Sequence, residues 1–353
     1  MAEYYVDPSG SDAGTGAVGD PWEHLNYALG QVSTDDTIWM NSGTYDDEAY
    51  FNAPAITVDI KSVTGDYRDV IIKPKTLLAT YYRWCNINSA ATLMKFWDVS
   101  FYFDQSNISN WGSNNYMIYG AGGASAGWSA IFTRCHIKAI TTTNSAYALY
   151  TYSTAKDGWQ CYKCVFEDWN VGTGYCIDAD DGDITVKDTI FINNYAAIIQ
   201  PGGSLDNDYN CFYNNSYDVA SGAIGANSIT SDPDFTTGVE IDETSPCFEA
   251  GVTVPGYVET YEGTAPDMGC FEAPVIVIVP DLTGMTLTEA SDELIRVNLV
   301  LGEVREVFGE ITDEPIVQAQ NPEAAEEVSP ETSVDLVMNK GAREGLSYLY
   351  RVF

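Results

Sequence analysis

Apolar positions recur regularly between residues 98 and 212. Five four-residue segments begin with a charged residue or tyrosine and end with an aromatic or aliphatic one: 98–101, 134–137, 163–166, 188–191 and 209–212. Their last residues lie 36, 29, 25 and 21 residues apart. Such repeats predict a coil of stacked parallel strands, a β-helix, with insertions at one corner. A β-sandwich would instead need hairpin turns about every 8 to 12 residues, and Asn-Gly hairpin signals are missing.

Asparagine pairs follow two of these segments. Asn193-Asn194 comes after the fourth segment and Asn214-Asn215 after the fifth. Asparagine tolerates the left-handed backbone region that a sharp corner requires. The pairs therefore support corners at equivalent places in successive turns.

The N-terminal region has a different pattern. An alternating run at Tyr5-Val6 leads through a turn-rich loop to a short amphipathic segment with Trp22, Leu25 and Leu29 on one face. A strand at 35–40 and a turn at 42–45 follow. This order resembles the N-terminal cap and first turn of right-handed parallel β-helix proteins of the pectate-lyase-like superfamily. A second resemblance lies further along the chain. Segments like those that form the last turns of such coils occur at residues 231–235, 245–251 and 265–272, so the resemblance covers residues 3–273.

From residue 275 the pattern changes again. A helix is predicted with Ala290, Leu294 and Ile295 on one face and Thr286 or Thr288 as its cap. Strands are expected at 300–307, 315–322 and 333–341. Residues 276–341 resemble a single PASTA domain, although 324–328 depart from the usual Pro-Gly-Thr turn. This resemblance implies a module of the kind associated with peptidoglycan fragments, or a plain packing and attachment module.

The fold class is therefore mainly β: a right-handed parallel β-helix with a small C-terminal α+β PASTA-like domain. The expected domains are a β-helix domain with an N-terminal cap at 1–274, a PASTA-like domain at 275–341 and a C-terminal docking tail at 342–353. The tail alternates apolar side chains, which suits docking onto a partner by strand addition. Its proposed docking residues are Leu346, Tyr348, Leu349, Tyr350, Val352 and Phe353.

Charge narrows the range of partners. The 353 residues include 51 acidic and 16 basic side chains, for a formal net charge of -35. Such a chain repels nucleic acid and anionic membranes. No apolar run is long enough to span a bilayer. An anionic polysaccharide would be repelled too, unless cationic side chains gather locally.

The spacing of the eight cysteines does not match that of a zinc site. Cys161 and Cys164 have CxxC spacing, but no second such pair or nearby histidine completes a zinc site. In a continuous strand the two thiols would point to opposite faces. Buried free thiols are the preferred interpretation, with disulfides and a metal site as alternatives.

Catalytic signals are weak. Acidic pairs occur at Asp35-Asp36 and Asp46-Asp47, but without the basic or histidine residues that lyases and polygalacturonases need. His24 and His136, the latter near Lys138, are expected at the surface. No catalytic residue is assigned.

One acidic loop is a candidate Ca²⁺ site, and no other cofactor is expected. Its possible ligands are Asp178, Asp180, Asp181 and Asp183. The loop places Gly182 one position early for an EF-hand and lacks the closing glutamate. A solvated turn is the alternative.

Function is inferred from the start of the coil, the lack of a visible signal peptide and the apolar tail. These features resemble phage virion proteins: capsid decoration proteins, tail fibres and tailspikes. They favour a non-enzymatic structural protein on a virion surface, anchored to other virion proteins through its C-terminal region. It would display the coil to a surface glycan, and a homotrimer is one expected assembly. The alternatives are a cell-surface or wall-associated carbohydrate-binding protein and a polysaccharide lyase or glycoside hydrolase.

Overall fold

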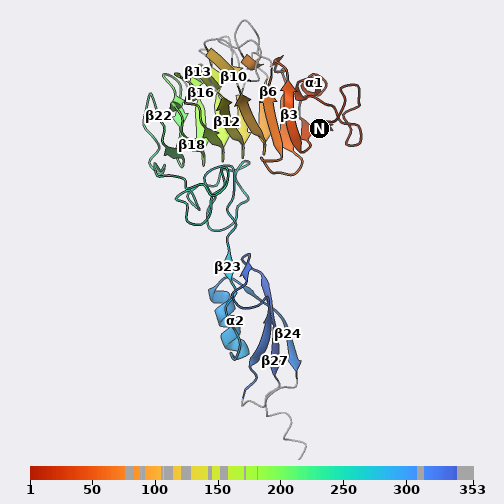
Figure 1. Cartoon of the computed structure of the whole chain (residues 1–353), viewed down its shortest axis with the longest axis vertical. Helices are drawn as coiled ribbons and strands as arrows, with labels where there is room; N and C mark the ends of the chain where they lie inside the picture. Colours follow the sequence, from red (N-terminus) through yellow and green to blue (C-terminus); the bar gives the residue numbers. More distant parts are fainter. Residues whose placement is uncertain are drawn as a thin grey trace, which may run out of the picture. The chain divides into compact units, whose positions relative to one another are not determined.

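The computed structural model describes residues 1–75, 83–87, 89, 92–104, 106, 114–120, 129–141, 145–151, 158–170, 172–180, 182–307 and 314–339. The chain divides into two compact units, Met1–Ala273 and Pro274–Phe353. The first unit contains the stacked strands, and the second contains a small sheet with one helix (Figure 1). Neither helix in the described part of the chain has the length and apolar character needed to cross a bilayer.

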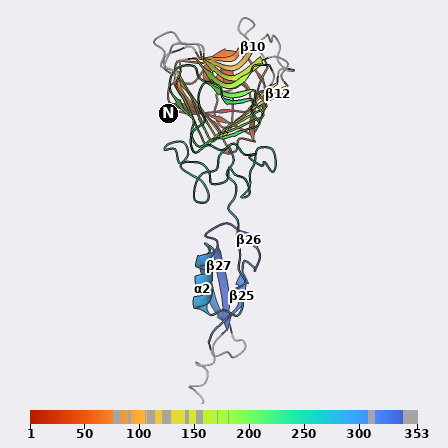
Figure 2. The ribbon, with the colours of Figure 1, turned by 90° about the vertical axis from the view of Figure 1, so that its left-hand side faces the viewer.

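Three parallel sheets build the first unit. After the first strand of sheet 1, each turn of the chain adds one strand to each sheet. Sheet 1 consists of β1 (Glu3–Val6), β2 (Asp36–Met40), β5 (Thr57–Ser62), β8 (Leu93–Trp97), β11 (Ser129–Thr133), β14 (Trp159–Tyr162), β17 (Ile184–Lys187) and β20 (Leu205–Asp206). Sheet 2 consists of β3 (Gly43–Glu48), β6 (Val70–Pro74), β9 (Ser100–Asp104), β12 (His136–Thr141), β15 (Val165–Glu167), β18 (Ile190–Ile192) and β21 (Cys211–Tyr213). Sheet 3 consists of β4 (Phe51–Asn52), β7 (Arg83–Ile87), β10 (Asn114–Gly120), β13 (Ser145–Thr151), β16 (Tyr175–Ala179), β19 (Ala196–Ile199) and β22 (Tyr217–Val219). Figure 2 looks nearly along this coil, so strands of successive turns overlap around the core. The parallel coil predicted from the sequence is confirmed.

The register of sheet 2 follows the sequence repeat. The five segment ends pair in order through sheet 2: Phe101, Ile137, Phe166, Phe191 and Phe212. The first residue of each segment is not in a strand but at a left-handed corner, with φ between 51° and 59°. Each four-residue segment therefore corresponds to a corner followed by the start of a strand of sheet 2.

Aromatic rings stack inside the coil. Phe166 and Phe191 have ring centroids 5.1 Å apart, and Phe191 and Phe212 are 5.2 Å apart, with interplanar angles of 11° and 5°. All three side chains are buried. Because equivalent residues lie in register on adjacent strands, identical side chains can stack through successive turns.

Asparagines satisfy buried backbone groups at the next corner. Asn193 and Asn214 have φ values of 58° and 52°. Asn194 accepts a bond from Trp169 N at 3.0 Å, and its own amide group donates to Asn215 Oδ1 at 2.9 Å. The corner role expected for the asparagine pairs is confirmed.

The N-terminal cap covers the first turn. Trp22 and both leucines of α1 (Leu25–Leu29) are buried, as the amphipathic pattern predicts. His24 precedes this helix, and its Nδ1 lies 2.9 Å from Asp12 Oδ2. The side chain thus joins the cap loop to the start of α1.

Residues 231–273, here called the closing segment, do not form the last turns of the coil. They contain no strand of the three sheets and instead pack against the outer face of sheet 2, with a turn at 254–258 against sheet 1. Val165, Ile190 and Cys211 on that face share a buried cluster with Cys247 and Met268. The expectation from the closing motifs is therefore wrong in this respect. The segment is rich in turns and lacks the alternation that a strand needs.

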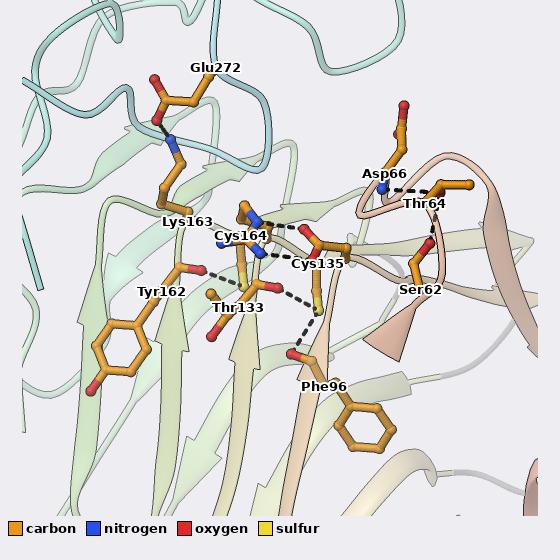
Figure 3. A network of polar contacts seen from close by, with 12 residues as sticks. Ser62, Thr64, Asp66, Phe96, Thr133, Cys135, Tyr162, Lys163, Cys164 and Glu272 are labelled. Atoms are coloured by element: carbon orange, nitrogen blue, oxygen red, sulfur yellow. Dashed lines mark hydrogen bonds and ion pairs between the residues drawn. The ribbon is translucent and has the colours of Figure 1, made fainter. Parts of the chain in front are cut away.

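The eight cysteines are buried as free thiols. Cys161 and Cys164 both face the interior, so the expectation of opposite faces is wrong. The strand ends at Tyr162, and Lys163 turns the chain with φ of 51°. The Cys164 thiol lies 3.4 Å from the carbonyl oxygens of Phe132 and Tyr162. Figure 3 shows this thiol beside that of Cys135 from the preceding turn.

The second unit contains β23 (Val277–Ile278), α2 (Leu287–Arg296), β24 (Val300–Val307), β25 (Val317–Asn321), β26 (Glu327–Val328) and β27 (Ser333–Asn339). Strand β27 lies between β24 and β25, parallel to the former and antiparallel to the latter. Strands β23 and β26 form a separate antiparallel pair.

Helix α2 begins with a capping box. Thr286 accepts a bond from Glu289 N, and the Glu289 carboxylate accepts one from Thr286 N. Ala290 and Leu294 are buried, but Ile295 is 71% exposed. The prediction that Ile295 shares the buried face is wrong, because it lies about 100° around the helix from Leu294.

Candidate functional site

Sheet 1 presents a row of large side chains on its outer surface. Parallel pairing aligns Trp39 of β2 with Lys61 of β5, and Lys61 with Trp97 of β8. Ile38 and Phe96, which precede the two tryptophans, are fully buried. Because side chains alternate along a strand, Trp39, Lys61 and Trp97 face outward.

Lys61 lies between the two indole rings. Its Nζ is 5.9 Å from the centroid of the Trp39 ring and 5.2 Å from that of Trp97. The guanidinium carbon of Arg134 is 5.9 Å from the Trp97 ring. Cations at this distance are attracted by the negative face of the ring. Trp97 Nε1 also donates to Asp59 Oδ1 at 3.0 Å, which fixes the ring.

These side chains line an open pocket of about 410 Å³. Its wall is completed by the turn at 62–65 and by Asp98 and Arg134. Arg134 Nη2 donates to Asp98 Oδ2 at 2.7 Å. Burial raises the pKa of the Asp98 carboxyl, and the hydrogen bonds from Arg134 oppose that shift. The result is a concave site that combines flat aromatic surfaces with a few oriented polar groups.

The pocket gathers positive charge in a strongly acidic protein. Lys61 and Lys95 approach Asp59 at 3.9 and 4.0 Å, which is too long for hydrogen bonds. With Arg134, which is paired with Asp98, they place three cationic side chains beside two carboxylates, an excess of one positive charge. Such an excess is the condition under which the acidic chain could accept an anionic polymer.

The predicted Ca²⁺ ligands differ in their surroundings and hydrogen-bond partners. Asp178 lies in β16 and is 7% exposed; burial, followed by the charge of Asp180, raises its pKa to about 7. Asp183 Oδ1 instead accepts bonds from Ser204 N and Oγ at 2.8 and 2.6 Å. Asp181 lies outside the described residues. Within the described residues no cluster of three or more metal-ligating side chains is suitable for an ion, so Ca²⁺ binding stays a prediction.

His136 is not a surface residue, contrary to expectation. It is 5% exposed, and its Nε2 lies 2.9 Å from Glu167 Oε2. Lys138 Nζ is also 2.9 Å from that oxygen. The partner comes from the next turn of the coil, which the sequence around His136 does not reveal.

Lys163 forms a buried ionic cluster with the closing segment. Its ammonium pairs with Glu272, as Figure 3 shows, and the side chain is 2% exposed. Burial lowers the pKa of Lys163 to about 8, against the charges of Asp267 and Asp188. Because the closing segment covers these groups, they connect that segment to the coil rather than face a ligand.

The six predicted docking residues of the C-terminal tail lie outside the described residues. Their role stays a prediction. No sequence motif marks the pocket, although the alternation of residues 36–40 places Trp39 on the opposite face from Ile38 and Met40.

Comparison with known proteins identifies the second unit. Residues 277–340 match the PASTA domain family. A probable serine/threonine-protein kinase PknB from Corynebacterium glutamicum is 40% identical over 67 residues. The match covers 19% of this chain and 10% of the kinase, so the chain spans about a tenth of that relative's length.

Solved structures resemble the chain only distantly. Pectate lyase Pel9A shares 13% identity with a TM-score of 0.27, covering 77% of this chain and 96% of the lyase. A pectin methylesterase from Aspergillus niger shares 13% identity with a TM-score of 0.35, covering 75% of this chain and 91% of the esterase. Alginate lyase AlyGC shares 12% identity with a TM-score of 0.29, covering 65% of this chain and 39% of the lyase.

The PASTA match leaves the expected virion role without support and agrees better with the cell-surface or wall-associated alternative. The chain joins a coil of stacked parallel strands to a C-terminal PASTA domain.

Proposed function

We propose that this protein is a non-catalytic carbohydrate-binding protein of the cell wall or cell surface, and that it holds a glycan over Trp39, Lys61 and Trp97. The observation that carries the proposal is the pair of outward indole rings with Lys61 between them. The polarised C–H groups of a sugar face complement the negative face of an indole. The PASTA domain supports a wall association, as its sequence resemblance implied.

The polar groups favour a glycan that carries carboxylates. Lys61 and Lys95, which lie too far from Asp59 for hydrogen bonds, would attract an acidic sugar to a surface that is otherwise strongly negative. The pocket acids already have partners, since Asp59 accepts a bond from Trp97 and Asp98 is held by Arg134. They are therefore poorly placed to act as the pair of carboxyl groups that glycoside hydrolysis requires.

Substitution of Trp97 tests the binding site. We expect Trp97→Ala to weaken binding of an acidic glycan selected on a glycan array by tenfold or more, about 1.4 kcal/mol. Isothermal titration with the full-length protein gives the affinity. Tyr217→Ala, which removes a 53% exposed ring from sheet 3, is the matched control.

Equal affinity of Trp97→Ala and the wild type would contradict the proposal, as would an array on which no glycan binds. The binding should also weaken with added salt, since exposed charges are screened. Release of reducing or unsaturated sugar ends during incubation would show an enzyme instead.

A further inference from the structure

Lys163 holds its amine where an ammonium ion is poorly accommodated. The side chain is 2% exposed and pairs with the carboxyl group of Glu272, which the closing segment brings onto this corner of the coil (Figure 3). An ammonium ion has three N–H groups to donate. Within the part of the chain that the structure describes, Nζ makes no hydrogen bond. A buried charge without hydrogen bonds is costly, so a neutral form of this nitrogen is favoured.

The preceding corner of the coil contains an ordinary ion pair. Arg134 and Lys163 occupy equivalent corners of successive turns, with φ of 52° and 51°. Arg134 Nη2 donates to Asp98 Oδ2 at 2.7 Å, and 31% of the arginine side chain is exposed. Arg134 therefore has both a hydrogen-bonded partner and access to water, whereas Lys163 has neither.

The backbone of the closing segment holds the Glu272 carboxyl group. Both of its oxygens accept from Asp267 N, at 3.3 and 3.4 Å. Asp267 is itself fixed, because its carboxylate accepts from Glu249 N and from Ala273 N at 2.7 Å each. An N–H group directed at a carboxyl oxygen stabilises the negative charge that develops there when a nucleophile attacks the carbon. The segment thus presents a polarised carboxyl carbon to the Lys163 amine.

Burial also increases the fraction of Lys163 that is a free amine. It lowers the pKa of Lys163 to about 8, although the charges of Asp267 and Asp188 oppose this shift. Asp188 is fully buried, and burial raises the pKa of its own carboxyl group to about 7. Near neutral pH the cluster therefore contains some neutral amine, the form whose lone pair attacks a carbonyl carbon.

We propose that Lys163 and Glu272 join in an intramolecular isopeptide bond that fixes the closing segment to the coil. One proton passes from the ammonium group to the carboxylate, which leaves a neutral amine and a carboxylic acid. Nζ then attacks Cδ of Glu272, so that a C–N bond forms and the C–OH bond breaks. The hydroxyl group leaves with a second proton of the amine as one molecule of water. The amide keeps one N–H group, and the reaction needs no oxidant or further reactant.

Intact-mass spectrometry of the full-length protein under reducing conditions tests the bond. We expect the wild type to be lighter than its sequence by one water molecule. Lys163→Arg keeps the positive charge but lacks the nucleophilic amine, and Glu272→Ala lacks the carboxyl group, so both variants should have the full mass. Lys187→Arg is the matched control. Lys187 pairs with Asp206, whose side chain is 59% exposed, so this variant should lose water as the wild type does.

Peptide mapping locates the loss of water. Trypsin does not cut after an acylated lysine, so the digest should contain residues 157–187 uncut after Lys163 and linked to residues 188–296. Tandem mass spectrometry of this product identifies the two joined side chains.

Three results overturn the inference. The first is a full mass for wild-type protein that circular dichroism shows to be folded, which would leave only an ion pair at this corner. The second is a loss of water that maps to other residues, and the third is a loss that persists in Lys163→Arg. The first two come from the wild type and do not depend on whether a variant folds. None of the three bears on glycan binding, which is measured separately.

Discussion

Single residues at the corners show how backbone strain is tolerated. Arg134, Lys163 and Asp188 have φ between 51° and 54°, where a side chain costs roughly 1–2 kcal/mol. Each amide donates to a carbonyl of the next turn, as Arg134 N does to Tyr162 O at 3.0 Å. These bonds offset the strain, so the side chains can serve in ion pairs such as those of Arg134 with Asp98 and Lys163 with Glu272.

Asp178 gives a prediction on pH. Its folded pKa of about 7 exceeds the unfolded value of about 3.9, so the folded protein binds more protons between these values. The contribution of Asp178 to the free energy of unfolding is therefore fully present below about pH 4, and it is lost as the pH rises through about 7. Asp178→Asn should therefore raise the free energy of unfolding at about pH 8, by at most about 4 kcal/mol.

Urea unfolding at several pH values measures this effect. The difference between Asp178→Asn and the wild type should shrink toward about pH 4, where the wild-type carboxyl is neutral in the folded state. Asp292→Asn on the exposed side of α2 is the control. A difference that does not change with pH would contradict the prediction.

At the scale of elements, stacked side chains hold adjacent strands together. Phe191 is fully buried between Phe166 and Phe212. Phe191→Ala removes both ring contacts and leaves a cavity, and should lower the free energy of unfolding by about 3–5 kcal/mol. Urea unfolding provides the measurement. Phe191→Leu should lose clearly less, and equal losses would argue against a tightly packed stack.

The sequence repeat predicted the strands of sheet 2, but no sequence pattern predicted the pocket on sheet 1. The segment repeat gave the register of Phe101 through Phe212 because corner and strand recur together in each turn. Trp39, Lys61 and Trp97 are 22 and 36 residues apart and carry no local motif. Only the register of sheet 1 brings them together, and insertions of unequal length conceal that register in the sequence.

Two other side chains also have contacts that the local sequence does not reveal. The buried His136 has Glu167 of the next turn as its polar partner. Tyr257 gains its stacking partners from two different turns of sheet 1. Local sequence indicates whether a residue suits a strand, but not which residue a neighbouring turn places beside it.

At the scale of the whole molecule, the chain divides at Ala273 and Pro274. Ala273 and Val279 are each 1% exposed, whereas Ile276 between them is 46% exposed and outside any strand. Limited proteolysis should therefore cut first near residues 274–276 or in the tail at 342–353. Mass spectrometry of the fragments identifies the cuts. Early cuts within the described strands of the coil would contradict this division.

The closing segment has a consequence for biosynthesis. Ribosomes complete the strands of sheet 2 at Tyr213, before they reach Val239, Cys247 and Met268, which cover its outer face. Until those residues emerge, the nascent coil presents an apolar surface around Ile190, and such transiently exposed surfaces favour aggregation. The last part of the unit to be translated thus completes the burial of apolar side chains in the part made before it.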